Sequence, residues 1–252
     1  MSYLNFNDDL DKLKKFPKTN TQVLFIDPGS KACSQEELKP LIEALPDDYK
    51  IHIPEEYKKD GSNYSDISQK IEKDLLIHSQ NPELSKKLAL EVAEAVNAFY
   101  SITQDLHPLA SLRIVTEEYV KKEYPSVSQL YHRDSTSLTL TKCFYGNGAV
   151  YTTEDNINRN FFTTNSIATE DRFAVFDPSI EIEVKEKIWV LLKGEMWKGI
   201  DIRSQSLFDY VLGENARIKD YSKGIGFIHK GGYFNKSKKR LVFTISTWKT
   251  DF

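Results

Sequence analysis

The stretch Arg240-Leu-Val-Phe-Thr-Ile-Ser246 alternates between two kinds of side chain and indicates what kind of sheet the chain forms. Residues two apart on a β-strand point to the same face, so Arg240, Val242 and Thr244 would share one face. The leucine, phenylalanine and isoleucine between them would share the other. An all-apolar face suits packing beneath helices, whereas a cationic, hydroxyl-bearing face suits the lining of a small-ligand barrel. We therefore expect a strand with a buried side and a ligand-facing side.

Further strand-like segments, rich in β-branched and aromatic residues, occupy the chain from about Ser111 onward. Turn sequences at 145–148, 177–179 and 230–232 separate them. One helix, at about 204–212, is expected to interrupt the strands and to end at Gly213. Several short antiparallel strands in this order are typical of a jelly roll, or double-stranded β-helix. The expected strands are 113–116, 137–144, 172–176, 180–192, 225–229 and 240–248.

Residues 1–110 have a mixed pattern in which helices dominate. Strands are expected at 22–27 and 49–53, and helices at about 34–45, 65–78 and 83–104. The first helix begins with a capping box, because Ser34 and Glu37 stand three residues apart. The fold class predicted from the sequence is therefore α+β: an N-terminal mixed, mainly helical lobe (1–110) followed by a double-stranded β-helix core (111–252).

Composition is that of an ordinary globular protein, with 40% hydrophobic and 28% charged residues and a formal net charge of −3. So small a charge gives no reason to expect nucleic acid or an anionic membrane as a partner. The basic run at 236–240 is short, and we interpret it as a hairpin loop. Two cysteines, Cys33 and Cys143, form no disulfide or metal framework, which favours a reducing cytoplasm. The N-terminus has acids where a secretory signal needs apolar residues, and no stretch is long and apolar enough to span a membrane.

Three residues form a candidate metal site. His132 and Asp134 are spaced so that both side chains can point to one face of a strand, and His229 ends a later strand-like segment. Two imidazole nitrogens and one carboxylate oxygen can occupy one face of a divalent iron and leave the opposite face open. Arg240 follows a short distance along the chain, and its planar fork suits a carboxylate of a co-substrate.

The order of these motifs resembles the Fe(II)/2-oxoglutarate-dependent dioxygenase superfamily. The chain also resembles an uncharacterised bacterial domain family in the order of its motifs. These are His132-x-Asp134, Cys143-Phe-Tyr-Gly-Asn-Gly, Lys193-Gly-Glu-x-Trp197, His229 and Arg240-Leu. The resemblance covers about residues 125–250 and does not extend to the N-terminal lobe. It implies a double-stranded β-helix, iron held by the two histidines and Asp134, and 2-oxoglutarate held by Arg240. It implies no particular substrate.

Other residues are candidates for the same pocket. Thr141 and Tyr145 share parity on the strand after Asp134, so either hydroxyl could bind a co-substrate carboxylate. Tyr151 and Trp197 could line the substrate site, although aromatic residues in a β-rich core more often serve packing. The glycines at 146 and 148 favour a tight turn that needs positive φ.

Each site residue also has an ordinary structural role open to it. Asp134 could cap a turn, His132 could be a hydrogen-bonded core histidine, His229 could end a strand, and Arg240 could pair with an acid.

Three functions therefore stay open. The first is an Fe(II)/2-oxoglutarate oxygenase that hydroxylates or demethylates a small molecule or a protein. The second is a cupin-like zinc or manganese hydrolase or isomerase, and the third is a non-catalytic barrel that binds a ligand or a partner. The sequence predicts neither the substrate nor the oligomeric state.

Overall fold

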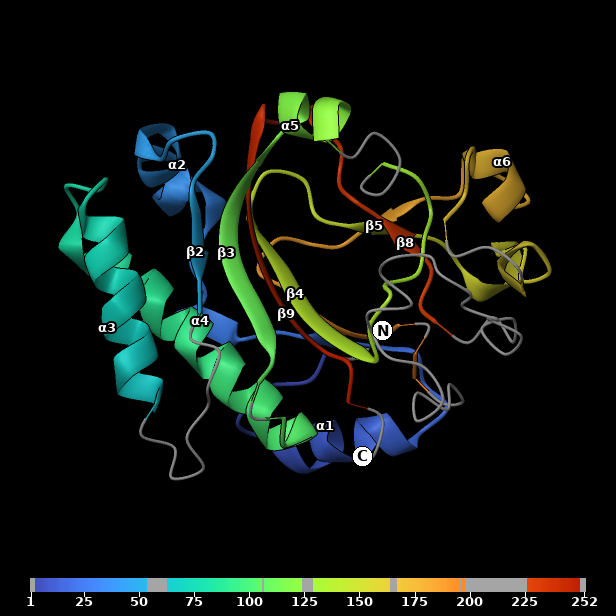
Figure 1. The fold of residues 1–252 in the computed structure, drawn as a ribbon, viewed down its shortest axis with the longest axis horizontal. Coiled ribbons are helices and arrows are strands. Elements are labelled where there is room, and N and C mark those ends of the chain that lie inside the picture. The colour runs from blue at the N-terminus through green and yellow to red at the C-terminus, as the bar shows by residue number, and fades with distance from the viewer. Residues whose placement is uncertain are drawn as a thin grey trace.

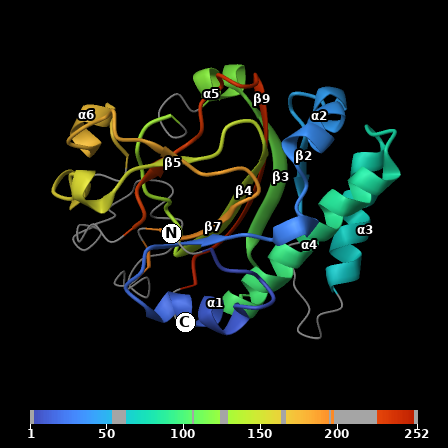
Figure 2. The ribbon, with the colours of Figure 1, turned by 180° about the vertical axis from the view of Figure 1, so that it is seen from behind.

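The computed structural model describes residues 3–53, 63–105, 107–123, 129–163, 167–194, 196–197 and 226–249. Within these residues the fold combines helices with two antiparallel sheets. The larger sheet has six strands in the order β1-β7-β4-β9-β3-β2, and the smaller has three in the order β6-β5-β8. In Figures 1 and 2, α3 and α4 lie on one side of the larger sheet, and β5 and β8 lie on the other.

The first part of the chain supplies helices and both edge strands of the larger sheet. Its elements are α1 (Leu10–Lys15), β1 (Val23–Ile26), α2 (Gln35–Ala44), β2 (Lys50–His52), α3 (Asn63–Leu76) and α4 (Pro82–Thr103), with short 3-10 turns at Phe16–Lys18 and Gly29–Lys31. The strand β1 pairs with β7, and β2 pairs with β3. A border at residue 110 would therefore cut through one continuous sheet.

The second part supplies the centre of that sheet and all of the smaller one. Its strands are β3 (Leu109–Thr116), β4 (Leu138–Tyr145), β5 (Val150–Tyr151), β6 (Ile182–Glu183), β7 (Trp189–Lys193), β8 (His229–Lys230) and β9 (Lys239–Thr247). Two helices, α5 (Glu117–Glu123) and α6 (Asp171–Ala174), and 3-10 turns at Glu154–Asn156 and Phe161–Thr163 connect them.

The alternation predicted for β9 is confirmed. Leu241, Phe243 and Ile245 are fully buried in the main hydrophobic core. That core also contains the apolar face of α4, including Leu88 and Val92, as the helical spacing predicted. The hydrophobic effect therefore fixes which side of β9 faces the helices, and the opposite side is left to line a cavity.

Three predicted strands differ from the structure. In the segment predicted at 225–229, residues 226–228 form no strand, and His229 begins β8 instead of ending a strand. Residues 172–176 do not form a strand, because α6 occupies Asp171–Ala174 and the side chains of Phe173 and Phe176 are exposed. These two aromatic side chains led to the prediction of a strand, but they do not lie on the buried face of a sheet. The long strand predicted at 180–192 is two strands, β6 and β7, which belong to different sheets. The chain turns between them, where Lys187 has a φ of 72°.

The helix predicted at 204–212, with its end at Gly213, lies outside the described residues. Among the described residues, no helix is long and apolar enough to cross a membrane.

Candidate metal centre

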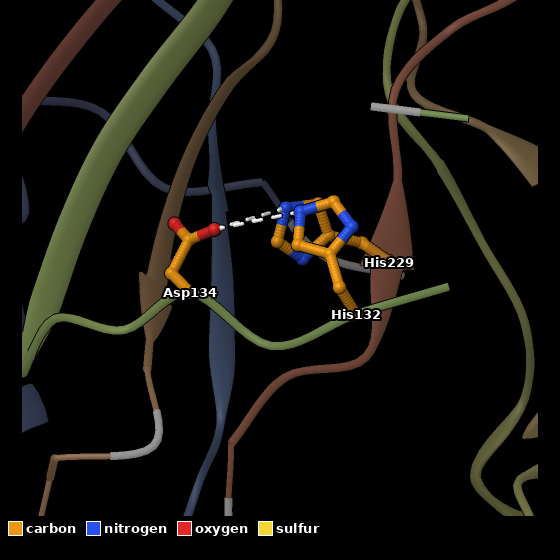
Figure 3. A group of neighbouring side chains, drawn as sticks. All are labelled: His132, Asp134 and His229. Carbon is orange, nitrogen blue, oxygen red and sulfur yellow. Dashed lines mark ion pairs between the residues drawn. The ribbon is translucent and has the colours of Figure 1, made fainter. Parts of the chain in front are cut away.

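Three side chains from distant parts of the sequence converge at one point between the two sheets. Asp134 Oδ1 lies 3.7 Å from His132 Nε2 and 3.6 Å from His229 Nε2. The two imidazole rings are 4.5 Å apart between centroids and tilted by 52°. Figure 3 shows both rings with a nitrogen directed at the carboxylate. All three potential ligand atoms lie within 4.8 Å of one another, which fits a single metal ion.

Backbone pairing brings the two histidines together. His229 is the first residue of β8, which pairs with β5 of the smaller sheet. His132 is not part of a regular strand, but its N–H donates to His229 O (2.8 Å) and its O accepts from His229 N–H (3.1 Å). The strand geometry predicted around His132 is therefore reduced to two isolated antiparallel bridges, one to Ile167 and one to His229. The bridge to His229 is enough to place the two rings side by side.

The backbone also orients each ring. His132 Nδ1 lies 2.8 Å from Leu130 O, and His229 Nδ1 lies 3.4 Å from Phe227 O. A carbonyl oxygen only accepts, so each Nδ1 carries a proton in these contacts, and Nε2 is the ring nitrogen that faces Asp134. In metal sites, the ring nitrogen of a histidine that does not bind the metal usually donates to a carboxylate, a backbone carbonyl or water, and this bond holds the ring in place.

The surroundings of His132 favour the neutral form of its imidazole. Burial, with the neighbouring His229 as a second cause, lowers the pKa of His132. A neutral His132 is available as a ligand at neutral pH, as metal binding requires. Both histidines are buried, at 8% exposure each. Two imidazole nitrogens and a half-buried carboxylate that lie around one point form a donor set that fits a divalent metal.

A close approach between two loops sets the position of Asp134. A Cβ added to Gly194 would lie 2.6 Å from Asp134 O and 2.0 Å from Thr136 O. Gly194 N–H also donates to Ser137 O at 3.0 Å. Only glycine fits where the chain leaving β7 lies against the loop that carries Asp134. Gly194 of the Lys193-Gly-Glu motif thus supports the position of Asp134.

A cavity of about 750 Å³ adjoins the three residues. Its walls come from β9, β4, β7 and β3 of the larger sheet and from the smaller sheet. The cation-bearing face of β9 therefore faces a cavity, as its alternation predicted. Besides His132, Asp134 and His229, its lining residues include Thr139, Thr141, Tyr151, Val190, Leu192, Phe227, Arg240, Val242 and Thr244.

Arg240 is held in this wall by neutral groups. Its Nε donates to Asn147 O (2.9 Å), its Nη1 donates to Gly232 O (3.3 Å), and its guanidinium lies 5.8 Å from the Phe234 ring centroid. Arg240 is only 5% exposed, and no carboxylate of the described residues forms an ion pair with it. The cavity wall thus contains a fixed positive charge.

The two hydroxyl residues predicted on β4 lie on different sides of the sheet. Thr141 lines the cavity, and its Oγ1 donates to Phe243 O at 2.8 Å. Tyr145 instead packs against the main core and is not among the described lining residues. A register shift between Cys143 and Tyr145 reverses the parity after Cys143, and this corrects the prediction that Thr141 and Tyr145 share a face.

Of the two aromatic candidates, Tyr151 lines the cavity and Trp197 does not. Trp197 is buried elsewhere, with its Nε1 donating to Pro17 O at 2.8 Å. The predicted turn is present, because Gly146 has a φ of 87° and a Cβ there would lie 2.8 Å from Arg240 Cγ. Gly146 therefore lets the turn pack closely against the arginine.

Sequence reasoning missed the contribution of β3 to the cavity. Arg113 and Val115 line it because β3 pairs with β9, with Arg113 opposite Val242 and Val115 opposite Arg240. Alternation within 109–116 could have shown that these two residues share a face. Only the pairing register shows that this face is the cavity side.

Comparison with known protein families finds no match, and comparison with curated proteins finds none either. Solved structures with a similar fold include a dioxygenase for auxin oxidation from rice (9% identity, TM-score 0.45, covering 100% of this chain and 84% of that one). The 2-oxoglutarate complex of its Arabidopsis thaliana counterpart is another (10% identity, TM-score 0.44, 100% and 94% covered). A third is a full-length Neurospora crassa protein in complex with alpha-KG and 5-formyluracil (12% identity, TM-score 0.40, 97% and 83% covered). Because these sequence identities and TM-scores are low, the function of this chain has to be inferred from its own residues.

Proposed function

We propose that this chain is a non-haem Fe(II)/2-oxoglutarate-dependent oxygenase with a double-stranded β-helix fold. The observation that carries the proposal is the convergence of His132, Asp134 and His229, with both Nδ1 atoms occupied by backbone carbonyls. A two-histidine, one-carboxylate set with an open side is typical of non-haem iron oxygenases. The presence of two antiparallel sheets around one cavity supports the double-stranded β-helix part of the proposal.

The protein contributes position and charge. His132, Asp134 and His229 would hold the iron on one side, which leaves its other side toward the cavity. Arg240 would bind the far carboxylate of 2-oxoglutarate, since its guanidinium is already fixed by the carbonyls of residues 147 and 232. When bound, the iron supplies the oxidising chemistry by which such enzymes hydroxylate or demethylate a substrate carbon.

Thr141 supports this arrangement indirectly. Its own proton is committed to Phe243 O, and its oxygen lies 3.3 Å from Thr244 Oγ1. It can therefore accept from Thr244 and fix the orientation of that hydroxyl in the cavity wall. Apolar side chains such as Leu192 and Phe227 cover other parts of the wall and limit the access of water.

Arg240 favours the oxygenase over the alternative metal enzyme. The same three ligands could hold zinc or manganese in a hydrolase or isomerase. Such an enzyme has no general need for a buried guanidinium in the wall beside the metal, whereas a dicarboxylate co-substrate needs one.

The test is metal-dependent binding of 2-oxoglutarate, measured without oxygen by thermal shift and by calorimetry. Fe(II), and redox-inert Mn(II), should raise the melting temperature, and 2-oxoglutarate should raise it further only when a metal is present. A ligand at about a hundredfold excess over its Kd stabilises the native state by about 2.7 kcal/mol. Glutarate, which lacks the 2-oxo group, is the matched control and should bind far more weakly.

Turnover completes the test, because an active oxygenase converts 2-oxoglutarate to succinate in air. Stabilisation by zinc or manganese with no response to 2-oxoglutarate would favour the hydrolase or isomerase. No response to any metal would favour a non-catalytic binding barrel.

A further inference from the structure

A buried lysine lies directly behind the candidate metal centre, and the proposed chemistry does not use it. Lys230 is the second and last residue of β8, immediately after His229. Successive residues of a strand point to opposite faces, so Lys230 points away from the cavity that His229 lines. Lys230 is only 2% exposed. Because burial of an ammonium is costly unless it is paired, the partners of Lys230 indicate its role.

Two carboxylates from different segments hold the Lys230 ammonium. Its Nζ lies 2.6 Å from Asp171 Oδ2, at the start of α6, and 2.5 Å from Glu181 Oε1, just before β6. The Tyr233 hydroxyl donates to Glu181 Oε1 at 2.7 Å. In Figures 1 and 2, α6 lies beyond the smaller sheet as seen from the larger one. The ammonium therefore ties β8 to the part of the chain behind it.

The same ammonium also contacts the residue that precedes the other histidine ligand. His132 and His229 form an antiparallel bridge. Tyr131 and Lys230 are the next residues on the two chains, so their side chains point to the opposite face of that bridge. The Lys230 Nζ lies 4.7 Å from the centroid of the Tyr131 ring. Tyr131 in turn belongs to a buried apolar cluster that includes Ala174 of α6.

Backbone contacts alone hold His229 less firmly than His132. The Nδ1 of His229 lies 3.4 Å from Phe227 O, beyond the usual range of about 2.7–3.2 Å, whereas the corresponding contact of His132 is 2.8 Å. In addition, β8 is only two residues long, so its backbone pairing offers little resistance to a shift. An anchor on the adjacent residue, Lys230, restrains the strand and with it the His229 ring.

We propose that Lys230 is a positioning residue of the metal centre, which fixes β8 and thereby the imidazole of His229. Asp171 and Glu181 supply the fixed points to which its ammonium is bound. The inference rests on the proposed function, because it requires that His229 holds a metal. An ion pair that served stability alone would change the free energy of unfolding and leave metal coordination unaltered.

The test uses Co(II), whose visible absorption spectrum depends on the number and geometry of its ligands. Lys230→Met removes the ammonium, and Lys230→Arg keeps the positive charge. The matched control is the double variant Glu91→Gln with Lys142→Met, which removes another buried ion pair that does not line the cavity. Co(II) affinity is measured by calorimetry without oxygen, at a temperature at which denaturant titration shows each variant to be folded. The spectrum of each saturated protein is then recorded.

Lys230→Met should bind Co(II) about 10–100-fold more weakly than the wild-type protein, as is usual when the support of a metal ligand is removed. Its Co(II) absorption bands should also change in position or intensity, because the His229 ring is no longer fixed. Lys230→Arg should recover Co(II) affinity to within about fivefold of the wild-type value, since a guanidinium can pair with both carboxylates. The control variant should keep the wild-type spectrum and an affinity within about threefold.

Asp171 provides an independent check through a double-mutant cycle. Asp171→Asn should weaken Co(II) binding in the wild-type background. In the Lys230→Met background the same change should weaken it by less than about twofold further, because the two residues act as one unit. Fully additive losses would show that Asp171 does not act through Lys230, and they would overturn the inference.

A wild-type Co(II) affinity and spectrum in Lys230→Met would also overturn it. Equal losses of affinity in Lys230→Met and in the control variant would do the same, since general destabilisation would then be the cause. Equal losses in Lys230→Met and Lys230→Arg would assign the effect to packing rather than to the ion pair. Co(II) binding by the wild-type protein that strengthens the response to 2-oxoglutarate shows separately that the proposed function stands. Absence of any Co(II) binding by the wild-type protein would remove both.

Discussion

At the level of single residues, the geometry of the candidate site depends on the backbone groups that each histidine side chain contacts. The carbonyls of Leu130 and Phe227 turn both Nε2 atoms toward Asp134. The sequence predicted the three ligands from residue type, spacing and a resemblance. It could not predict which ring nitrogen faces the ion, because the orienting groups are backbone atoms of ordinary residues. Nor could it predict Arg113, whose place depends on strand register.

Arg240 offers a direct test of the co-substrate site. Arg240→Gln should weaken 2-oxoglutarate binding by about 2 kcal/mol or more, roughly thirtyfold, since a buried charged partner is lost. Mn(II) affinity, measured by calorimetry in the same variant, should change by less than about threefold. Arg240→Lys keeps the positive charge but loses the planar guanidinium fork. Its affinity for 2-oxoglutarate should therefore lie between those of the wild-type protein and Arg240→Gln. Equal 2-oxoglutarate binding by Arg240→Gln and the wild-type protein would show that another group holds the co-substrate.

At the scale of elements, helices and strand faces could be predicted from periodicity, but the connections between them could not. The alternation of β9 predicted its buried and cavity faces, and the stripe on α4 predicted a core helix. The register shift after Cys143 is a local departure from alternation, and no residue type in the sequence marks it. The aromatic residues near α6 misled the prediction because they are exposed.

The loop after β7 offers a test of how Asp134 is positioned. Gly194→Ala should displace the loop that carries Asp134, because the added methyl would lie 2.0 Å from Thr136 O. We expect metal affinity to fall about 10–100-fold, as is usual when the support of a ligand is removed. Gly29→Ala is the control, since Gly29 has a φ of 71° but no atom within 4 Å of the added methyl. It should lower stability without changing metal affinity, and an unchanged metal affinity in Gly194→Ala would contradict the account.

The start of α2 offers a test of local stability. Ser34→Ala should lower the free energy of unfolding by about 1 kcal/mol, because Ser34 Oγ accepts from Glu37 N–H at 3.2 Å. The Ser34 N–H, followed by the Lys87 ammonium, lowers the pKa of Glu37 from 4.5 to about 2. The contribution of Glu37 is therefore present above about pH 4.5 and is lost as the pH falls toward 2.

Ser101→Ala is the matched control for Ser34→Ala, since the Ser101 hydroxyl only bonds back to Asn97 O within α4. Urea titrations at about pH 7 and about pH 3 would measure both variants. The deficit of Ser34→Ala relative to the wild-type protein should shrink at the lower pH. An equal deficit at both pH values would show that Glu37 takes no part in the cap.

At the level of the whole molecule, the described residues of the two parts of the sequence share one sheet, one hydrophobic core and a buried ion pair. Lys142 on β4 is paired with Glu91 on α4, and both side chains are almost completely buried. Glu91 also accepts from Cys33 N–H (2.9 Å) and Trp189 Nε1 (3.2 Å). The sequence predicted that residues 1–110 are mainly helical, but it did not predict how they attach to the rest of the molecule. Strand pairing between distant segments depends on the tertiary structure and has no local sequence pattern.

Breaking this pair should be costly. Glu91→Gln would leave the Lys142 ammonium buried without a counter-charge, so we expect a loss of about 3–5 kcal/mol in the free energy of unfolding. The double change Glu91→Gln with Lys142→Met should regain part of that loss, since it removes the unpaired ammonium and keeps a side-chain oxygen that can accept from Cys33 N–H or Trp189 Nε1. Denaturant titration would measure both. A Glu91→Gln variant as stable as the wild-type protein would show that the pair does not hold α4 to the sheet.

The proposed function requires that His132, Asp134 and His229 hold one metal ion together. The most direct measurement is the iron content of the protein reconstituted with Fe(II) without oxygen and then freed of unbound metal. We expect one iron per chain in the wild-type protein and in His52→Ala, a matched change at an exposed histidine outside the centre. Folded His132→Ala, Asp134→Ala and His229→Ala should contain little or no iron. Iron retained at one per chain in these three variants, or no iron in the wild-type protein, would rule out a metal centre at these residues.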